Sequence, residues 1–165
     1  MVFMLFRFLF IPTKHINTKI IVTSDLKEKA KSITNSENLI VVQPNEKYCV
    51  EQISFETIPS YNTNKQFHPK QNNWVGYVIE LNGLKYYIAG DTDITDENKT
   101  VKCDVAFVPV GGTYTMTAKE AADLVNIIKP KIAVPIHYGS VVGTKQDAID
   151  FVNLLDERID GKILM

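Results

Sequence analysis

The second half of the chain alternates between apolar and amphipathic segments, and this order constrains the fold more than any other feature. Residues 103–110 (CDVAFVPV) form a continuous apolar run. Thr117 and Glu120 then form a capping box that opens a helical pattern. A second apolar run, 131–136 (KIAVPI), precedes another helical pattern over 146–157. The order strand–helix–strand–helix predicts an α/β sheet with helices on at least one face.

Both helical patterns place apolar side chains on one face, as helices packed against a sheet do. Pro130 ends the first of them. The side chains expected to point inward are Ala121, Ala122, Val125 and Ile128 in the first helix, and Ala148, Ile149, Val152 and Leu155 in the second.

The first half contains shorter β-rich segments. Residues 18–23 (TKIIVT) are apolar and β-branched, which predicts a buried strand. Ser24 is then expected to cap a helix over 25–33. Residues 39–43 (LIVVQ) predict another strand, and 47–58 predict one or two more.

A polar loop and a hairpin follow. Residues 59–73 are rich in Asn and read as a loop of about fifteen residues, a length that is often functional. The β-rich runs 75–81 and 84–90 flank Asn82-Gly83, the strongest short-range signal for a β-hairpin.

Composition narrows the class of protein. The chain has 165 residues, 45% of them hydrophobic, and a net charge of -1, which fits one globular domain. The basic residues are scattered among acidic ones, so a nucleic-acid interface is not expected. Two cysteines, Cys49 and Cys103, are too few for a disulfide scaffold and are expected to be small buried hydrophobes. A reduced, cytoplasmic setting is the default expectation.

The N-terminus is the most apolar stretch. Residues 1–11 are too short to span a membrane, and Arg7 interrupts them without a cleavage site for a signal peptide. We expect either a buried strand or helix here, or a segment foreign to the native fold. The expected organisation is a divergent segment over 1–17 and a single domain over 18–165.

Three apolar strands end in a similar way. Asp91 follows one, Gly111-Gly112 follows the next, and His137 follows the third. Because sites in α/β folds form beyond the carboxyl ends of strands, Asp91 and His137 are candidates to converge. Together they could bind a divalent metal or act as an acid/base pair.

Several linked motifs resemble one family. The chain is similar to the C-terminal half of a metallo-β-lactamase-fold hydrolase over roughly residues 18–160, and it resembles the subgroup related to the L-ascorbate-6-phosphate lactonase. The motifs that carry the resemblance are GDTDI at 90–94, DVAFVPVGG at 104–112, the helix at 115–130, PIHYG at 135–139, and the loop YNTNKQFHPKQNNWVGYVIE at 61–80.

The resemblance implies a fold, a cofactor and a reaction. The fold is α/β, an αββα four-layer sandwich that is incomplete on its N-terminal side. Asp91 and His137 match metal-ligand positions and are the expected catalytic residues. The cofactor is zinc or manganese, and a metal-bound hydroxide would attack a small metabolite that is lactone-like or phosphorylated.

The sequence also departs from the family pattern. The family's main ligand motif, HxHxDH, is expected before residues 18–23, but the chain contains no such motif, and His15 does not match its spacing. Asn62 stands where the family's middle histidine ligand is expected. A mononuclear site of Asp91, His137 and His68 is one alternative.

Those departures leave a second function open. The chain could be a non-catalytic, truncated or degenerate homologue that serves as an interaction module. Loss of N-terminal strands would expose a sheet edge, which favours homo-oligomers. If the chain is an enzyme, its activity is expected to be impaired.

Further residues are expected to line the site. His68 lies on the polar loop, where a solvent-exposed or substrate-contacting side chain is the plainer expectation. Lys65 could bind an anionic group, although a solvated lysine is the simpler interpretation. The residues expected to contact substrate are Asn62, Lys65, His68, Thr113 and Tyr114, with Trp74 lining the same pocket.

Overall fold

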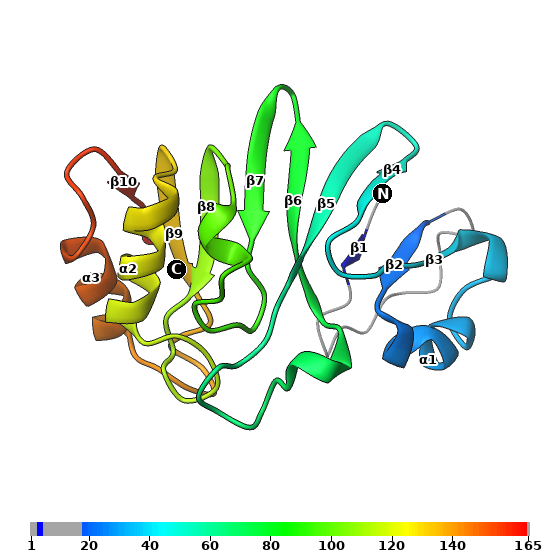
Figure 1. Ribbon diagram of the computed structural model, residues 1–165, viewed down its shortest axis with the longest axis horizontal. Coiled ribbons are helices and arrows are strands. Elements are labelled where there is room, and N and C mark those ends of the chain that lie inside the picture. The colour runs from blue at the N-terminus through cyan, green and yellow to red at the C-terminus, as the bar shows by residue number, and fades with distance from the viewer. Residues whose placement is uncertain (1–2, 5–17, 165) are drawn as a thin grey trace.

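Two β-sheets stack between helices in four layers. The computed structural model describes residues 3–4 and 18–164. In Figure 1 the larger sheet occupies the centre, two helices lie on one side of it, and the smaller sheet with its own helix lies on the other.

The larger sheet has seven strands in the order β10-β9-β8-β7-β6-β5-β4. Strands β4 to β7 form an antiparallel meander, whereas β7 to β10 run parallel. Its strands are β4 (Lys47–Val50), β5 (Ile53–Pro59), β6 (Val75–Leu81), β7 (Leu84–Ile88), β8 (Val105–Pro109), β9 (Ile132–Ile136) and β10 (Asp160–Gly161).

The smaller sheet is parallel, with the strand order β1-β2-β3. Its strands are β1 (Phe3–Met4), β2 (Ile20–Val22) and β3 (Leu39–Val41). Short helical segments lie between strands: η1 (Ser24–Leu26), α1 (Lys27–Lys31), η2 (Ser36–Asn38), η3 (Lys70–Asn72) and η4 (Asn98–Thr100).

Strand β2 shows how the two sheets face each other. Ile21 packs in one cluster with Phe55 and Tyr77 of the larger sheet. Its neighbours Ile20 and Val22 pack in another cluster, which includes Ala30 of α1. Side chains on a strand alternate between its faces, so β2 has α1 on one face and the larger sheet on the other.

Helices α2 (Ala118–Ile128) and α3 (Lys145–Asn153) cover the far face of the larger sheet. Ala121, Val125 and Phe151 are fully buried there. The layers therefore follow the order helix, sheet, sheet, helix. This agrees with the predicted α/β sandwich, and all the inward residues predicted for α2 are buried.

The predicted hairpin forms at β6 and β7. Leu81 pairs with Leu84, and the two residues between them have positive φ angles of 52° at Asn82 and 75° at Gly83. Asn and Gly tolerate this left-handed backbone, which a two-residue hairpin turn requires. The strand predictions for 47–58 and 103–110 also hold, as β4 with β5 and as β8.

The helices predicted over 25–33 and 146–157 are both shorter in the structure, where they are α1 and α3. The expected helix over 25–33 is a 3₁₀ turn followed by α1, and its Ser24 does not act as the cap. The last helix ends at Asn153, and Ile149, which was expected to point inward, is 40% exposed. One apolar residue of the pattern thus falls on the solvent side of α3.

The two cysteines behave differently from each other. Cys49 is exposed, so its predicted burial is wrong. Cys103 is partly buried against the core, and burial raises the pKa of its thiol to about 12. Cys103 is therefore a neutral thiol that fills space.

The N-terminal predictions for 1–11 and 1–17 lie outside the described residues, except that Phe3–Met4 pairs with β2 as a parallel strand. Among the helices that the structure describes, none is long and apolar enough to cross a membrane.

Replacing Thr117 with alanine should lower the free energy of unfolding by about 1 kcal/mol, because helix α2 loses its N-cap. The Thr117 hydroxyl accepts the Glu120 N–H at 3.2 Å, and the Glu120 carboxylate accepts the Thr117 N–H at 2.8 Å. Urea denaturation measures the change. Thr117→Ser keeps the hydroxyl and should stay near wild type; equal losses in both variants would contradict the capping role.

Candidate functional site

The candidate site lies where three parallel strands end at one edge of the larger sheet. Asp91 follows β7 and His137 follows β9, while β8 lies between them. Strands two positions apart are separated by about 10 Å, so the two side chains must reach across the end of β8 to meet.

Gly111, just after β8, makes this approach possible. A β-carbon at this position would lie 2.4 Å from the His137 carbonyl oxygen and 3.4 Å from His137 Nδ1. The first distance is far inside van der Waals contact. The backbone of His137 can therefore pack on the end of β8 only because residue 111 has no side chain.

The side chains of Asp91, His68 and His137 come together there. His137 Nε2 lies 3.5 Å from Asp91 Oδ1, and His68 Nε2 lies 3.3 Å from Asp91 Oδ2. The Asp91 and His137 side chains are 36% and 31% exposed, so the cluster opens to solvent. His68 arrives from the polar loop rather than from a strand end.

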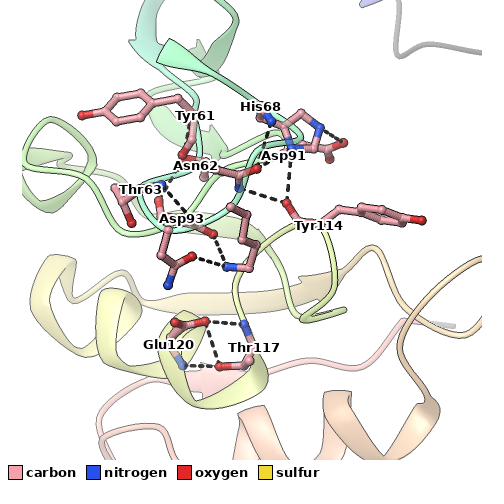
Figure 2. A network of polar contacts seen from close by, with 12 residues as sticks. Tyr61, Asn62, Thr63, His68, Asp91, Asp93, Tyr114, Thr117 and Glu120 are labelled. Carbon is pink, nitrogen blue, oxygen red and sulfur yellow. Dashed lines mark hydrogen bonds and ion pairs between the residues drawn. The ribbon is translucent and has the colours of Figure 1, made fainter.

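The protein fixes the orientation of the His68 imidazole. Its Nδ1 lies 3.1 Å from Asn62 Oδ1 and 3.2 Å from the Tyr114 carbonyl oxygen (Figure 2). The Asn62 oxygen is identified because it also accepts the His68 backbone N–H at 2.9 Å. Both neighbours of Nδ1 are acceptors, so Nδ1 carries a proton.

That tautomer has a chemical consequence. In neutral His68 the other nitrogen, Nε2, presents a lone pair toward a carboxylate oxygen of Asp91. Two acceptors at 3.3 Å repel each other unless a cation lies between them or the ring is protonated. The arrangement suits a shared metal cation or an imidazolium–carboxylate pair. A histidine that gives its other N–H to a backbone carbonyl is the usual metal-ligating form.

His137 is held differently. Its Nδ1 is buried with no hydrogen-bond partner among the described residues, so contacts do not fix its tautomer. Its φ angle of 61° is left-handed, which is uncommon for a residue with a side chain. The backbone turns sharply here, directly after β9, and this turn presents the ring to Asp91.

The three side chains form two pairs rather than one ring of ligands. Each imidazole faces a different oxygen of Asp91. In the described part of the chain, no group of three or more His, Cys, Asp or Glu side chains has the geometry to hold a metal ion. The side chains would have to move, or further ligands would have to be added, to surround one ion.

The loop that carries His68 is braced by hydrogen bonds, and His68 is only 9% exposed, so the expected solvent-exposed side chain is not observed. The Asn62 N–H donates to the His68 carbonyl at 2.7 Å. The Thr63 N–H donates to Asp93 Oδ2 at 2.9 Å (Figure 2). These bonds close the loop on itself and attach it to the segment that carries Asp91.

Most of the residues expected to contact substrate are instead bonded to, or packed against, other residues of the protein. Lys65 Nζ pairs with Asp93 Oδ1 at 2.8 Å, and the Asp93 side chain is almost fully buried. Asn62 uses its amide to hold His68 and the Tyr114 carbonyl. Thr113 is exposed beside the site, and the Tyr114 ring packs edge-on against Phe67 at 4.7 Å.

A second polar cluster holds the loop near both of its ends. The Tyr61 hydroxyl donates to Glu97 Oε2 at 2.9 Å, and Lys70 Nζ donates to Glu97 Oε1 at 2.9 Å. Burial raises the pKa of Glu97, but the hydrogen bonds from Lys70 and Tyr61 outweigh it and bring the value to about 2. Glu97 is thus a carboxylate that fastens both ends of the loop.

Sequence reasoning missed two residues near the site. Asp93 neutralises Lys65, and the second aspartate of the GDTD segment was the available signal. Asp25 accepts a hydrogen bond from the Trp74 indole at 2.9 Å. The two residues are far apart in sequence, and no local pattern indicates that they meet.

Comparison with known proteins identifies related sequences. A family described as the Beta-lactamase superfamily domain matches residues 8–137. A metal-dependent hydrolase of Thermococcus onnurineus is 32% identical over 120 residues, 70% of this chain and 54% of the relative. One of Listeria innocua is 37% identical over 93 residues, 54% of this chain and 41% of the relative. The chain spans about half the length of the curated relatives it matches.

Solved structures share the fold. A protein of Parabacteroides distasonis assigned as a metal-dependent hydrolase has a TM-score of 0.75 and 32% identity, over 88% of this chain and 63% of that one. A Thermotoga maritima member of the metallo-beta-lactamase superfamily has a TM-score of 0.62 and 22% identity, over 89% of this chain and 82% of that one. The second likeness shows the fold alone.

Replacing Gly111 with alanine should displace His137 and cost about 1–3 kcal/mol of stability, because the new β-carbon overlaps the His137 backbone. Urea denaturation and the NMR signals of the His137 ring measure both effects. Thr113→Ala is the control, since Thr113 is an exposed residue two positions later on the same loop. A Gly111→Ala protein with wild-type stability and an unmoved His137 ring would refute the role of this contact.

The Glu97 cluster should make stability depend on pH. The pKa of Glu97 falls from 4.5 to about 2 on folding, so its contribution is fully present above pH 4.5 and is lost as the pH falls toward 2. Glu97→Gln should therefore be less stable than wild type at neutral pH, with the gap closing between pH 4.5 and 2. Denaturation across this range measures it, with exposed Asp96→Asn as control. A constant gap would contradict the assignment.

Proposed function

The chain belongs to the β-lactamase superfamily, and from this premise we propose that it is a metal-dependent hydrolase domain whose metal ligands are Asp91, His68 and His137. The family match covers residues 8–137, which include all three. Relatives described as metal-dependent hydrolases support the activity.

The observation that carries the proposal is the orientation of His68. Its Nδ1 proton is held by Asn62 and the Tyr114 carbonyl, which leaves the Nε2 lone pair facing Asp91. A lone pair fixed against a carboxylate is unfavourable unless a metal cation lies between them or the ring is protonated, and the family match favours the metal. Asn62 is therefore proposed as the residue that orients a ligand, in the position where the family pattern suggests a ligand itself.

The donor set fits a divalent ion. Two imidazoles and one carboxylate are the ligand types of a catalytic zinc site, and manganese accepts the same donors, but the three side chains would have to close around the ion from their present two-pair arrangement. A bound ion would supply Lewis acidity, which lowers the pKa of water from 15.7 to about 7. The residues of this chain would hold the ion and leave one side of the site open, since Asp91 and His137 are partly exposed.

The proposed substrate is a small metabolite. Lys65 pairs with Asp93, which reduces its capacity to bind a phosphate, so a lactone-like compound is favoured over a phosphorylated one. We also propose that the chain forms a homo-oligomer through an edge of the smaller sheet.

The alternative is a non-catalytic homologue that acts as an interaction module. The absence of HxHxDH from the chain, and the pairing of each imidazole with its own carboxylate oxygen, favour weak or absent turnover. We therefore expect metal binding by this chain with little hydrolysis. Two measurements distinguish these functions: whether the chain binds metal, and whether the metal-bound chain hydrolyses lactones or esters.

The purified chain should bind zinc or manganese, and alanine at Asp91, His68 or His137 should weaken binding at least about tenfold, as loss of a ligand or of its supporting shell does. Competition with a chromophoric chelator measures the dissociation constants. Asn62→Ala should also weaken binding, because it frees the His68 ring.

Asp123→Ala is the matched control, because Asp123 is an exposed carboxylate on α2 whose described ion pair is with Lys119. It should bind metal like wild type. Binding that is absent in wild type, or unchanged in all three ligand variants, would rule out the proposed metal site and favour the interaction module.

A further inference from the structure

Trp74 connects the candidate site to the smaller sheet. Its indole packs edge-on against the His68 imidazole, with ring centroids 5.4 Å apart and an interplanar angle of 64°. At its other end, Trp74 Nε1 donates a hydrogen bond to Asp25 Oδ2 at 2.9 Å. One side chain therefore contacts both the proposed ligand and a residue 49 positions earlier in the chain.

Asp25 is itself held in place. It belongs to η1, which directly follows β2 of the smaller sheet. The Thr23 hydroxyl donates to Asp25 Oδ1 at 2.6 Å, so each carboxylate oxygen of Asp25 has its own donor. Because Thr23 is buried at the end of β2, this carboxylate is fixed relative to the smaller sheet.

The two sides of His68 thus depend on different parts of the fold. Its Nδ1 edge is held by Asn62 and Tyr114, which lie on loops of the larger sheet. On its other side it packs against Trp74, whose indole N–H bonds to Asp25 at the end of β2. An imidazole held by hydrogen bonds at one edge can still rock about that edge, and an aromatic ring packed against it limits this motion.

We propose that Asp25 and Trp74 act as a tether between the two sheets that positions the His68 imidazole, so that the smaller sheet sets the metal affinity of the site. The tether comprises the Thr23, Asp25 and Trp74 side chains. Trp74 and Asp25 are positioning residues, since neither is proposed to touch the metal. The inference rests on the proposed function in one respect, namely that His68 is a metal ligand.

The test compares variants that remove the hydrogen bond between Trp74 and Asp25 with variants that keep it. Trp74→Phe keeps an aromatic ring beside His68 but removes the indole N–H, and Asp25→Ala removes the acceptor. Asp25→Asn keeps an acceptor oxygen in the same place and should therefore keep the metal affinity of the wild type. Asp123→Ala again serves as an exposed carboxylate remote from the contact.

Cobalt(II) is the probe, because its visible absorption reports ligand geometry while titration gives its affinity. Asp25→Ala and Trp74→Phe should each weaken cobalt binding about threefold to tenfold and alter the spectrum, as expected for the loss of one hydrogen bond. The double variant should be no worse than either single one, because both remove the same contact. Asp25→Asn and Asp123→Ala should match wild type.

Wild-type affinity and an unaltered spectrum in both Asp25→Ala and Trp74→Phe would overturn the proposal. So would fully additive losses in the double variant, or a loss in Asp25→Asn as large as in Asp25→Ala. Thermal denaturation of the metal-free variants accompanies each titration. Losses of affinity that merely follow a global loss of stability, with an unchanged spectrum in the bound form, also count against a positioning role.

A metal-free measurement keeps this result separate from the fate of the proposed function. If wild type binds no cobalt, the proposed metal site fails, but the tether can still be read from the NMR signals of the His68 ring. Asp25→Ala and Trp74→Phe should shift or broaden those signals and leave the His137 signals unchanged. Unmoved His68 signals in both variants would refute the tether without reference to any metal.

Discussion

The packing of Gly111 against the backbone of His137 is the contact on which the candidate site depends. Parallel strands deliver Asp91 and His137 to one edge of the sheet but leave β8 between them. Any side chain at the end of β8 would keep the two apart, since even a β-carbon would lie 2.4 Å from the His137 carbonyl. The left-handed turn at His137 completes the approach. The candidate site therefore depends on the missing side chain at Gly111 as much as on the side chains of Asp91 and His137.

Much of the fold could be predicted from the sequence because its signals are local. The Asn82-Gly83 turn and the Thr117–Glu120 capping box each depend on residues within a few positions of one another. The helix ends and the exposure of Ile149 were harder, because the pattern of α3 does not show which turn faces solvent. The exposure of Cys49 on β4, an edge strand, likewise depends on sheet order, which no local pattern contains.

The site was predictable only in part, for the same physical reason. Asp91 and His137 follow apolar strands, so their convergence follows from parallel topology. His68 sits on a loop, and its burial depends on a bond to Asn62 of the same loop and on one to Tyr114, which lies 46 positions away. Lys65 resembles a solvated or anion-binding lysine until Asp93 is found beside it. Loop residues acquire their roles from partners far away in sequence, which composition and spacing do not show.

The three proposed ligands therefore differ in what holds them. Asp91 and His137 depend on the rigid parallel half of the larger sheet, whereas His68 depends on a loop braced by Asp93, Glu97 and Trp74. A loop closed by so many polar contacts can keep an imidazole buried without a strand beneath it. Because Trp74 in turn bonds to Asp25 at the end of β2, the smaller sheet contributes to the geometry of a site that it does not itself line with ligands. The two sheets thus act together on one histidine.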